Sequence, residues 1–202
     1  MRISAIIPAF NEARNIGNVL KVLVASEDLN EVVLVDDGST DETSEIGKRL
    51  GVKVIKLTER RGKGNAMREG VKATNSEIIV FFDADLKGLK LEHISQLIQP
   101  ILRREAVMCV GIRDRWGGLP QLLVRFDPLL AIGGERALRR YVFENIPERF
   151  IQGFAVETAL NYYCLKRKLP VKYVKLKGLD VIIKEKKWGF IKGFLDRLKM
   201  IY

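Results

Sequence analysis

The sequence predicts an α/β fold in which helices flank a mixed, mostly parallel sheet within a single domain. Short runs of β-branched and other apolar residues alternate in the first half with segments whose apolar residues recur at helical spacing. These runs are apolar throughout, which is typical of parallel strands covered on both faces. No linker-like stretch interrupts the 202 residues, and this length suits one domain.

Each predicted element follows from the local pattern of the chain. In the first half, strands are expected over 3–7, 32–35, 52–57 and 78–82, and helices over 16–24, after an N-cap at Ser39, Thr40 or Asp41, and over 65–73. In the second half, we expect a helix over 91–102, a strand over 106–112, a loop with some helix over 113–135, a helix over 153–169, strands over 171–177 and 180–184, and an amphipathic helix over 188–202.

Composition excludes several classes of protein. No apolar run approaches the roughly 20 residues that span a bilayer. The apolar stretch near the N-terminus is too short for a signal peptide. Cys109 and Cys164 form no C-x-x-C pair, and His93 is the sole histidine, so a disulfide framework and a Cys- or His-based zinc site are not expected. A reducing, cytoplasmic location is therefore the expectation.

The net charge of +10 is concentrated at the C-terminal end. Residues 161–202 carry twelve Lys or Arg and three Asp or Glu, whereas residues 1–160 are nearly neutral. Nucleic acid is not expected as a partner, because the basic segment has no recognisable binding motif. The basic amphipathic stretch 185–202 suits an anionic membrane surface, which would make the protein peripheral on the inner membrane face, with a lipid acceptor. Alternatively, its apolar side packs on the domain and its lysines are solvated.

Polar clusters follow the four strands of the first half, at 8–12, 36–37, 60–65 and 83–85. In parallel sheets ligands bind beyond the carboxyl ends of the strands, so these segments should converge on one edge. Asp83 and Asp85 flank one small residue, and such paired hard oxygen ligands suit Mg²⁺ or Mn²⁺. The alternative for this Asp-x-Asp pair is a helix cap with a turn aspartate.

The other two acidic and basic clusters complement that pair. Asp37, after the second strand, is placed to bond a ribose or a base, although the same segment also suits helix capping. Lys63 lies between Gly62 and Gly64, so the backbone can approach an anion before a helix N-terminus. Taken alone, this segment is better interpreted as a basic surface turn. In combination, the clusters predict a site for a nucleoside diphosphate and a divalent cation.

These segments resemble family 2 nucleotide-sugar glycosyltransferases, which have the GT-A fold. The matching stretches are Pro8-Ala9-Phe10-Asn11-Glu12, Val35-Asp36-Asp37-Gly38-Ser39-Thr40-Asp41, Arg61-Gly62-Lys63-Gly64-Asn65-Ala66 and Phe82-Asp83-Ala84-Asp85. Residues 134–140 and 153–160 resemble the branch of glucosyl-3-phosphoglycerate synthases and dolichyl-phosphate sugar synthase-like enzymes. The resemblance implies a donor half at 1–112, an acceptor half at 113–184 and the basic helix at 185–202.

The resemblance also implies roles for single residues. Nucleotide-sugar contacts fall to Pro8, Ala9, Glu12, Asp37 (the base), Lys63 (base and phosphates) and Asp83 (the ribose or the metal's water shell). Asp85 would ligate Mg²⁺ or Mn²⁺, with Asp83 beside it. Glu157 stands where the family carries an acceptor-side acid, and would act as the catalytic base of an inverting transfer to a hydroxyl or phosphate acceptor. Arg136 would bind the acceptor, unless it pairs with Glu157 structurally, as Arg139 also could.

One stretch departs from the phosphoglycerate branch. That branch has a histidine as third metal ligand in a late strand, whereas residues 177–183 contain none. Asp180 is the candidate oxygen ligand there. His93, at the start of a helix, is expected far from this stretch, as a surface or capping residue. The departure leaves the acceptor open between a lipid and a phosphorylated small molecule.

Two other functions compete with a metal-dependent glycosyltransferase. A sugar-phosphate nucleotidyltransferase needs a Gly-rich, Arg-containing loop after the first strand, and residues 8–12 are not one. A non-enzymatic basic module for membranes or nucleic acid would use the C-terminal charge, but it gives no role to the acids at the strand ends.

Overall fold

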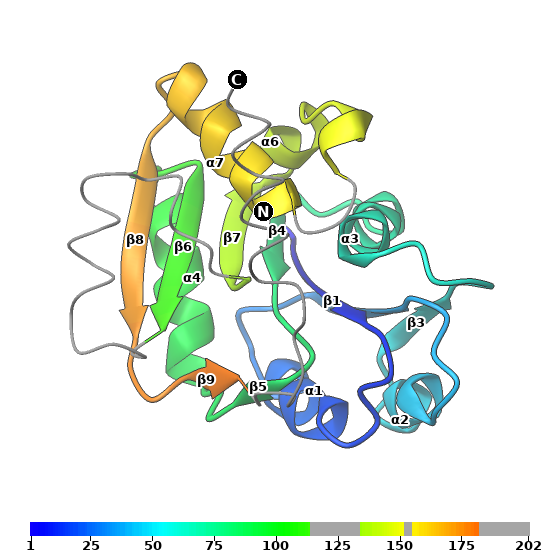
Figure 1. Ribbon diagram of the computed structural model, residues 1–202. Helices are drawn as coiled ribbons and strands as arrows, with labels where there is room; N and C mark the ends of the chain where they lie inside the picture. The colour runs from blue at the N-terminus through cyan, green and yellow to red at the C-terminus, as the bar shows by residue number, and fades with distance from the viewer. Residues whose placement is uncertain (114–133, 152–154, 182–202) are drawn as a thin grey trace.

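A computed structural model of the chain describes residues 1–113, 134–151 and 155–181 (Figure 1). The main sheet consists of β1 (Ile3–Ala9), β2 (Glu31–Asp36), β3 (Lys53–Lys56), β4 (Ile78–Phe81), β6 (Met108–Arg113), β7 (Arg136–Arg139) and β8 (Val171–Leu176). A two-stranded sheet pairs β5 (Leu86–Lys87) with β9 (Asp180–Val181). The helices are α1 (Ile16–Val24), α2 (Thr43–Arg49), α3 (Lys63–Lys72), α4 (Leu91–Leu102), α6 (Arg140–Glu144) and α7 (Ala155–Lys166), with a 3₁₀ turn η2 (Glu148–Phe150).

The seven-stranded sheet has the order β3-β2-β1-β4-β7-β6-β8. β3, β2, β1 and β4 are parallel to one another, and β6 is parallel to β8. β7 runs antiparallel to both of its neighbours, β4 and β6. The predicted fold class, a mixed and mostly parallel sheet with flanking helices, is therefore confirmed.

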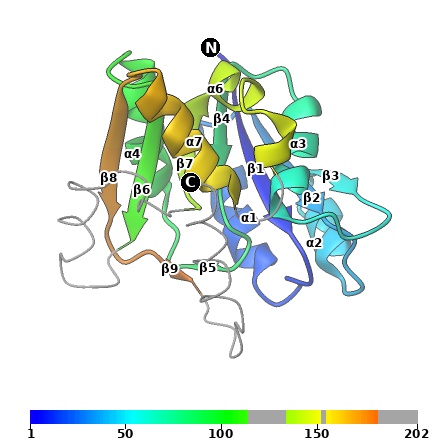
Figure 2. The same cartoon turned by 45° about the horizontal axis from the view of Figure 1, so that its top comes forward.

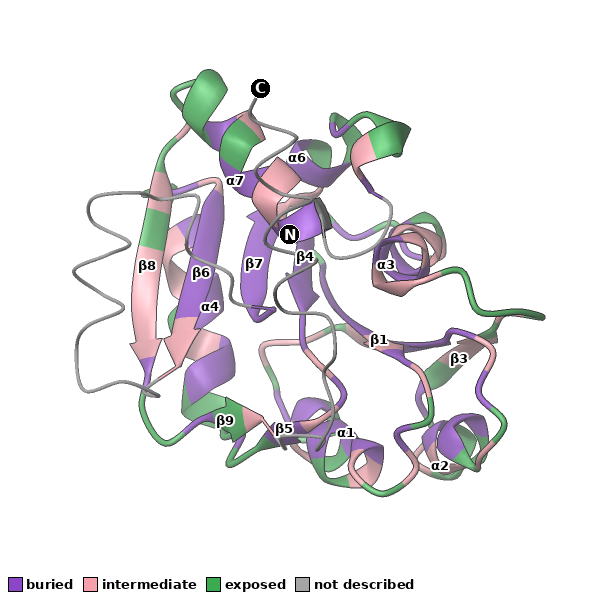
Figure 3. Cartoon of the chain, in the orientation of Figure 1, coloured by how far each residue is buried: buried purple, intermediate pink, exposed green. Residues whose placement is uncertain are grey.

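Helices cover both faces of the sheet, which explains why the central strands β1, β2 and β4 are mostly apolar. One hydrophobic core joins α1 and α4 to alternate residues of β1, and α2 packs against it. The second core joins α3, α6 and α7 to the opposite face (Figures 1 and 2). Burial follows this layering, because the central strands and the inward sides of the helices are buried (Figure 3).

Two strands escaped prediction. β7 has only four residues and both its ends are arginines, so it lacks the apolar run that marks the other strands. β5 has two residues and directly follows Asp85. α3 begins two residues earlier than expected, because Gly62 adopts a φ of 90° that lets the chain turn straight into the helix.

The residue predicted to cap the N-terminus of the second helix was wrong. α2 starts at Thr43, and its N-cap residue is Glu42 rather than Ser39, Thr40 or Asp41. The Asp41 carboxylate nevertheless accepts a hydrogen bond from the Thr43 backbone N–H at 3.1 Å.

Several expected elements lie outside the described residues. These are the loop with some helix within 114–133, residues 152–154 of the helix expected from 153, the end of the last strand, and the amphipathic helix over 188–202. Within the part of the chain that the structure describes, no helix is both long and apolar enough to cross a membrane.

Gly70 sets how closely α3 approaches the sheet. A Cβ at this position would overlap the Ile6 side chain and lie 3.1 Å from Val35 Cγ2. Both neighbours are β-branched and fully buried, so neither can move aside easily. Gly17 in α1 is the contrasting case, because its Cβ would make ordinary contact with Ile46 at 3.5 Å.

We expect Gly70→Ala to lower the free energy of unfolding by about 1–2 kcal/mol, since overpacking outweighs the gain in helix propensity. The matched variant Gly17→Ala should leave stability unchanged or raise it by up to about 1 kcal/mol. Urea unfolding followed by circular dichroism measures both values. Equal effects of the two substitutions would contradict the close approach of α3.

Candidate active site

The loops after β1 and β2 are tied together by hydrogen bonds. The Asn11 side-chain oxygen accepts from the Thr40 N–H at 2.9 Å, and the Asn11 N–H donates to Ser39 Oγ at 2.9 Å. The Glu12 N–H donates to Thr43 Oγ1 at 2.9 Å. Asn11 adopts a φ of 53°, a conformation that asparagine tolerates better than most residues. The two loops therefore form one rigid edge.

The predicted nucleotide contacts lie on this edge. Pro8 and Ala9 are the last residues of β1, opposite Val35 and Asp36 of β2. Glu12 is buried, and its carboxylate accepts a hydrogen bond from Asn15 Nδ2 at 2.8 Å. Their contacts to a nucleotide stay predictions.

Asp37 anchors the loop that follows β3. Its two carboxylate oxygens accept hydrogen bonds from the backbone N–H groups of Arg61, at 2.7 Å, and Gly62, at 2.8 Å. The side chain is nearly fully buried. Asp37 thus positions the turn that leads into Lys63, while its expected contact with a base stays a prediction.

Lys63, the first residue of α3, joins two carboxylates from distant parts of the chain. Its Nζ lies 2.6 Å from Asp83 Oδ1 and 2.6 Å from Glu157 Oε1. Burial alone would lower the pKa of Lys63, but the charges of Asp83 and Glu157 and their hydrogen bonds raise it above its ordinary value. The raised pKa favours the protonated, positively charged form of Lys63 between these two carboxylates.

Asp83 has a second cationic partner. Arg113, the last residue of β6, donates from Nη2 to Asp83 Oδ2 at 3.0 Å and from Nε to Glu135 Oε2 at 2.7 Å. Burial would lower the pKa of Arg113, but Glu135 and Asp83 raise it. Glu135 is fully buried, and burial together with the charge of Asp83 raises its pKa in spite of Arg113. Five side chains thus form an alternating chain of charges, the ion chain: Glu157, Lys63, Asp83, Arg113 and Glu135.

Sequence reasoning missed Arg113 and Glu135 as site residues. Glu135 lies in the segment that resembles the family, and Arg113 ends a predicted strand beside the other strand-end clusters, so both signals were present. Gly134 completes the local packing, because a Cβ there would lie 2.6 Å from Asp83 Cγ. The backbone at Gly134, just before β7, therefore packs directly against the Asp83 carboxylate.

Arg136 is buried beneath α7. It is 0% exposed, and its Nη1 donates to the Glu157 carbonyl at 3.2 Å and to Asn161 Oδ1 at 3.3 Å. Burial lowers the pKa of Arg136. This arginine supports the backbone that carries Glu157, whereas the Glu157 carboxylate itself pairs with Lys63. A direct contact of Arg136 with an acceptor stays a prediction.

Asp85 lies between Asp83 and β5, and its negative charge contributes to the raised pKa of Arg113. The carboxylates of Asp83 and Asp85 fit the hard oxygen donors that Mg²⁺ and Mn²⁺ prefer. Among the described residues, no group of three or more His, Cys, Asp or Glu side chains is arranged to hold a metal. A cation bound here would therefore need oxygen ligands from a substrate or from water. Asp180 is exposed, and its Oδ1 accepts from the N–H of Val181.

The expectation that His93 lies at the surface, far from the late strand, was wrong. His93 is fully buried, and its Nε2 lies 3.0 Å from the Lys177 carbonyl oxygen. Its Nδ1 accepts from the Lys90 N–H at 3.2 Å, so the capping role is confirmed. These bonds place the proton on Nε2. The ring fastens the turn before β9 to the start of α4.

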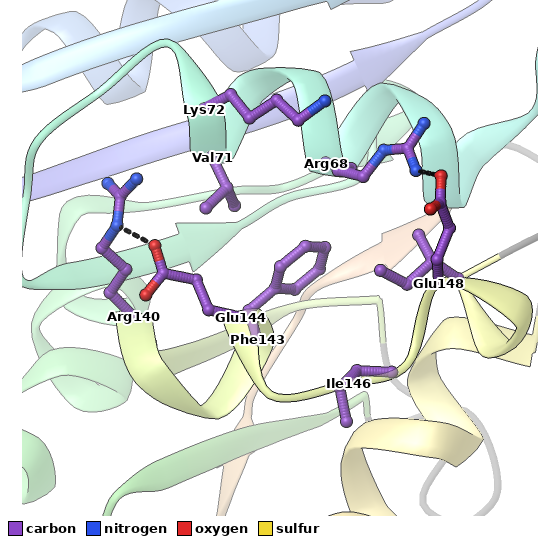
Figure 4. Close-up of a pocket in the computed structure, with 9 residues that line it drawn as sticks. Arg68, Val71, Lys72, Arg140, Phe143, Glu144, Ile146 and Glu148 are labelled. Atoms are coloured by element: carbon purple, nitrogen blue, oxygen red, sulfur yellow. Dashed lines mark hydrogen bonds and ion pairs between the residues drawn. The ribbon is translucent and has the colours of Figure 1, made fainter.

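A separate cavity of about 450 Å³ lies between α3 and the α6–η2 segment (Figure 4). Its apolar lining includes Val71 and Phe143, and four of its charged residues form two ion pairs. Arg140 Nε lies 2.6 Å from Glu144 Oε1, and Arg68 pairs with Glu148. None of the predicted site residues lines this cavity.

Arg113→Met should destabilise the protein by about 3–5 kcal/mol, because it leaves the Glu135 carboxylate buried without its cation. The double variant Arg113→Met/Glu135→Met should recover at least about 1 kcal/mol of that loss, since no buried charge then lacks its partner in this pair. Urea unfolding of the wild type, both single variants and the double variant gives the coupling energy. Strictly additive losses would show that the pair is not energetically linked.

Comparisons with known proteins identify relatives of this chain. The sequence model of "Glycosyl transferase family 2" matches residues 4–158. Glucosyl-3-phosphoglycerate synthase of Mycolicibacterium smegmatis is 29% identical over 192 residues, covering 78% of this chain and 62% of that protein. Dolichol-phosphate mannosyltransferase of Pyrococcus furiosus is 35% identical over 124 residues, covering 58% of this chain and 35% of that protein.

Solved structures show the same fold. The glucosyl-3-phosphoglycerate synthase of Mycobacterium tuberculosis, in complex with Mn²⁺, uridine diphosphate and glucosyl-3-phosphoglycerate, superposes with a TM-score of 0.77 at 25% identity over 98% of this chain and 75% of that one. Another structure of that enzyme holds Mg²⁺ and uridine diphosphate. The chain spans less than two thirds of the length of the curated relatives described here. Because the family model matches most of the chain, this protein belongs to glycosyl transferase family 2.

Proposed function

We propose that this chain transfers a sugar from a nucleoside diphosphate sugar to a hydroxyl or phosphate acceptor, with Mg²⁺ or Mn²⁺ as cofactor. The observation that carries the proposal is the position of Lys63, whose ammonium group bridges Asp83 and Glu157. A donor-side acid and an acceptor-side acid thus meet at one cation, where the bond between sugar and phosphate would lie. The Mn²⁺ and uridine diphosphate bound to the related synthase support this assignment.

The nucleotide would lie on the edge formed by the first two loops. Pro8 and Ala9 would contact it through the backbone, Glu12 through its carboxylate and Asp37 at the base. The hydrogen bonds from Asn11 to Ser39 and Thr40 hold this edge in place before any ligand arrives. Such pre-organisation reduces the entropy lost on binding.

The diphosphate would lie beside Lys63 and the Asp83/Asp85 pair. Asp85 would ligate the metal, with Asp83 facing the ribose or the metal's water shell. A bound Mg²⁺ or Mn²⁺ stabilises the negative charge that the departing diphosphate develops. Lys63 contributes a positive charge to the same group, and its raised pKa keeps it protonated at any physiological pH.

The acceptor would approach from the side of α7. Glu157 is almost fully buried, and its backbone carbonyl is held by Arg136. In a transfer that inverts the anomeric carbon, the Glu157 carboxylate would take the proton of the acceptor hydroxyl as the acceptor oxygen bonds to the anomeric carbon. The bond from that carbon to the diphosphate would break, and the nucleoside diphosphate would leave with the electron pair. Relatives named for phosphoglycerate and dolichol phosphate suggest an acceptor that carries phosphate.

The basic excess of residues 161–202 suits such an acceptor or an anionic membrane surface. We also propose that the protein is cytoplasmic and contacts the inner membrane face through residues 185–202. The separate cavity between α3 and α6 has no role in it.

A thermal-shift panel of nucleoside diphosphate sugars with Mg²⁺ and Mn²⁺ tests the donor site, because a ligand that binds only the folded state raises the melting temperature. We expect one donor to shift the wild type selectively. Asp85→Asn should abolish metal-dependent turnover of that donor while the protein still folds. Unchanged turnover by Asp85→Asn would refute the metal assignment.

Glu157→Gln separates donor binding from transfer. It keeps the size of the side chain and a hydrogen-bonding oxygen for Lys63, but it cannot accept a proton. We expect kcat for transfer to fall by about 10²–10⁴-fold, the usual contribution of a general base. The dissociation constant for the donor, measured by calorimetry, should change less than about tenfold, within the 1.4 kcal/mol that corresponds to that factor. A variant with wild-type kcat would exclude Glu157 as the base.

A further inference from the structure

Asp83 is held from both sides by positive groups that belong to the protein. Lys63 Nζ lies 2.6 Å from its Oδ1 and Arg113 Nη2 lies 3.0 Å from its Oδ2. Each carboxylate oxygen therefore already faces a cation. A divalent ion that approached Asp83 in this arrangement would meet like charges at short range, where Coulomb repulsion is strong in a partly buried site.

The protein alone also offers few ligands to such an ion. The described residues contain no group of three His, Cys, Asp or Glu side chains that could hold a metal. Mg²⁺ commonly binds through one or two carboxylates and completes its shell with water and substrate phosphates. The Asp83/Asp85 pair corresponds to the protein's share of such a shell.

We propose that Lys63 is an internal counter-ion that balances the Asp83 carboxylate while the donor is absent and so disfavours a divalent cation at the adjoining Asp83/Asp85 pair, with the result that cation and nucleoside diphosphate bind together. This inference rests on the proposed function, since it assumes that the diphosphate comes to this edge. The diphosphate gives the Lys63 ammonium group a new anionic partner and gives the cation its missing oxygens. By linkage, each of the two ligands then raises the affinity for the other by the same factor.

Lys63 rather than Arg113 is the group that can leave. Arg113 is anchored through Nε to the fully buried Glu135 at 2.7 Å. Lys63 has a flexible four-carbon stem and begins α3 directly after Gly62, whose φ is 90°. When Lys63 turns to the diphosphate, it also leaves Glu157 Oε1. The acceptor-side carboxylate is then released only in the presence of donor.

The test measures Mn²⁺ binding by the electron paramagnetic resonance of free Mn²⁺, and uridine diphosphate binding by calorimetry. For the wild type, we expect uridine diphosphate to tighten Mn²⁺ binding at least about tenfold, and Mn²⁺ to tighten uridine diphosphate binding by the same factor. Equal Mn²⁺ affinity with and without the nucleotide would overturn the proposal.

Two variants test the role of Lys63 without any nucleotide. Lys63→Met removes the counter-ion, so Mn²⁺ alone should bind at least about tenfold more tightly than to the wild type. The matched variant Lys63→Arg keeps the charge and should bind Mn²⁺ alone as weakly as the wild type. Thermal melting checks that each variant folds. A folded Lys63→Met variant that gains no Mn²⁺ affinity would overturn the proposal. If this variant does not fold, the proposal is tested by the effect of uridine diphosphate on Mn²⁺ affinity in the wild type.

The two arms also separate this inference from the function on which it rests. If no nucleoside diphosphate binds the wild type in the presence of Mn²⁺, the proposed donor site is wrong. If the nucleotide binds but Lys63→Met leaves Mn²⁺ affinity unchanged, the donor site stands and the counter-ion role is wrong.

Discussion

The ion chain of Glu157, Lys63, Asp83, Arg113 and Glu135 is the interaction on which the site depends. Each member is largely buried, and a buried charge is costly unless an opposite charge lies against it. The alternating signs satisfy this requirement only if α3, β4, β6, β7 and α7 all keep their relative positions. The pairing of charges in the site therefore depends on the packing of these helices and strands.

The antiparallel strand β7 makes this arrangement possible. It lies between β4 and β6, so it delivers Glu135 to the end of β6 and Arg136 to the underside of α7. Gly134 lets the chain enter β7 against the Asp83 carboxylate, where any larger residue would collide with it. Because β7 is antiparallel to both β4 and β6, the strands β4 and β6 run in the same direction, and Arg113 at the end of β6 lies at the same edge as Asp83. The entry to β7 adds Glu135, the second carboxylate that Arg113 binds.

The sequence was sufficient to predict the strands and helices of the first half of the fold, because most strands there are apolar runs that end in a polar cluster. The roles predicted for the site residues stay predictions. The sequence was not sufficient for β7, whose buried Arg136 resembles a surface residue until its partners on α7 are known. The pairing of Lys63 with Glu157 joins residues 94 positions apart, and no local pattern encodes it. His93 likewise appeared exposed, because the Lys177 carbonyl that its ring contacts lies 84 positions away.

If the strand-end edge binds a nucleoside diphosphate, Lys63 should exchange its carboxylate partners for phosphate. The most direct test is a crystal structure with uridine diphosphate and Mn²⁺, in which the distances from Lys63 Nζ are measured. We expect a diphosphate oxygen within hydrogen-bonding distance of Nζ, Mn²⁺ on Asp85, and a broken contact between Lys63 and Glu157. Nucleotide bound elsewhere, or a Lys63 that still bridges Asp83 and Glu157 at 2.6 Å beside bound nucleotide, would contradict it.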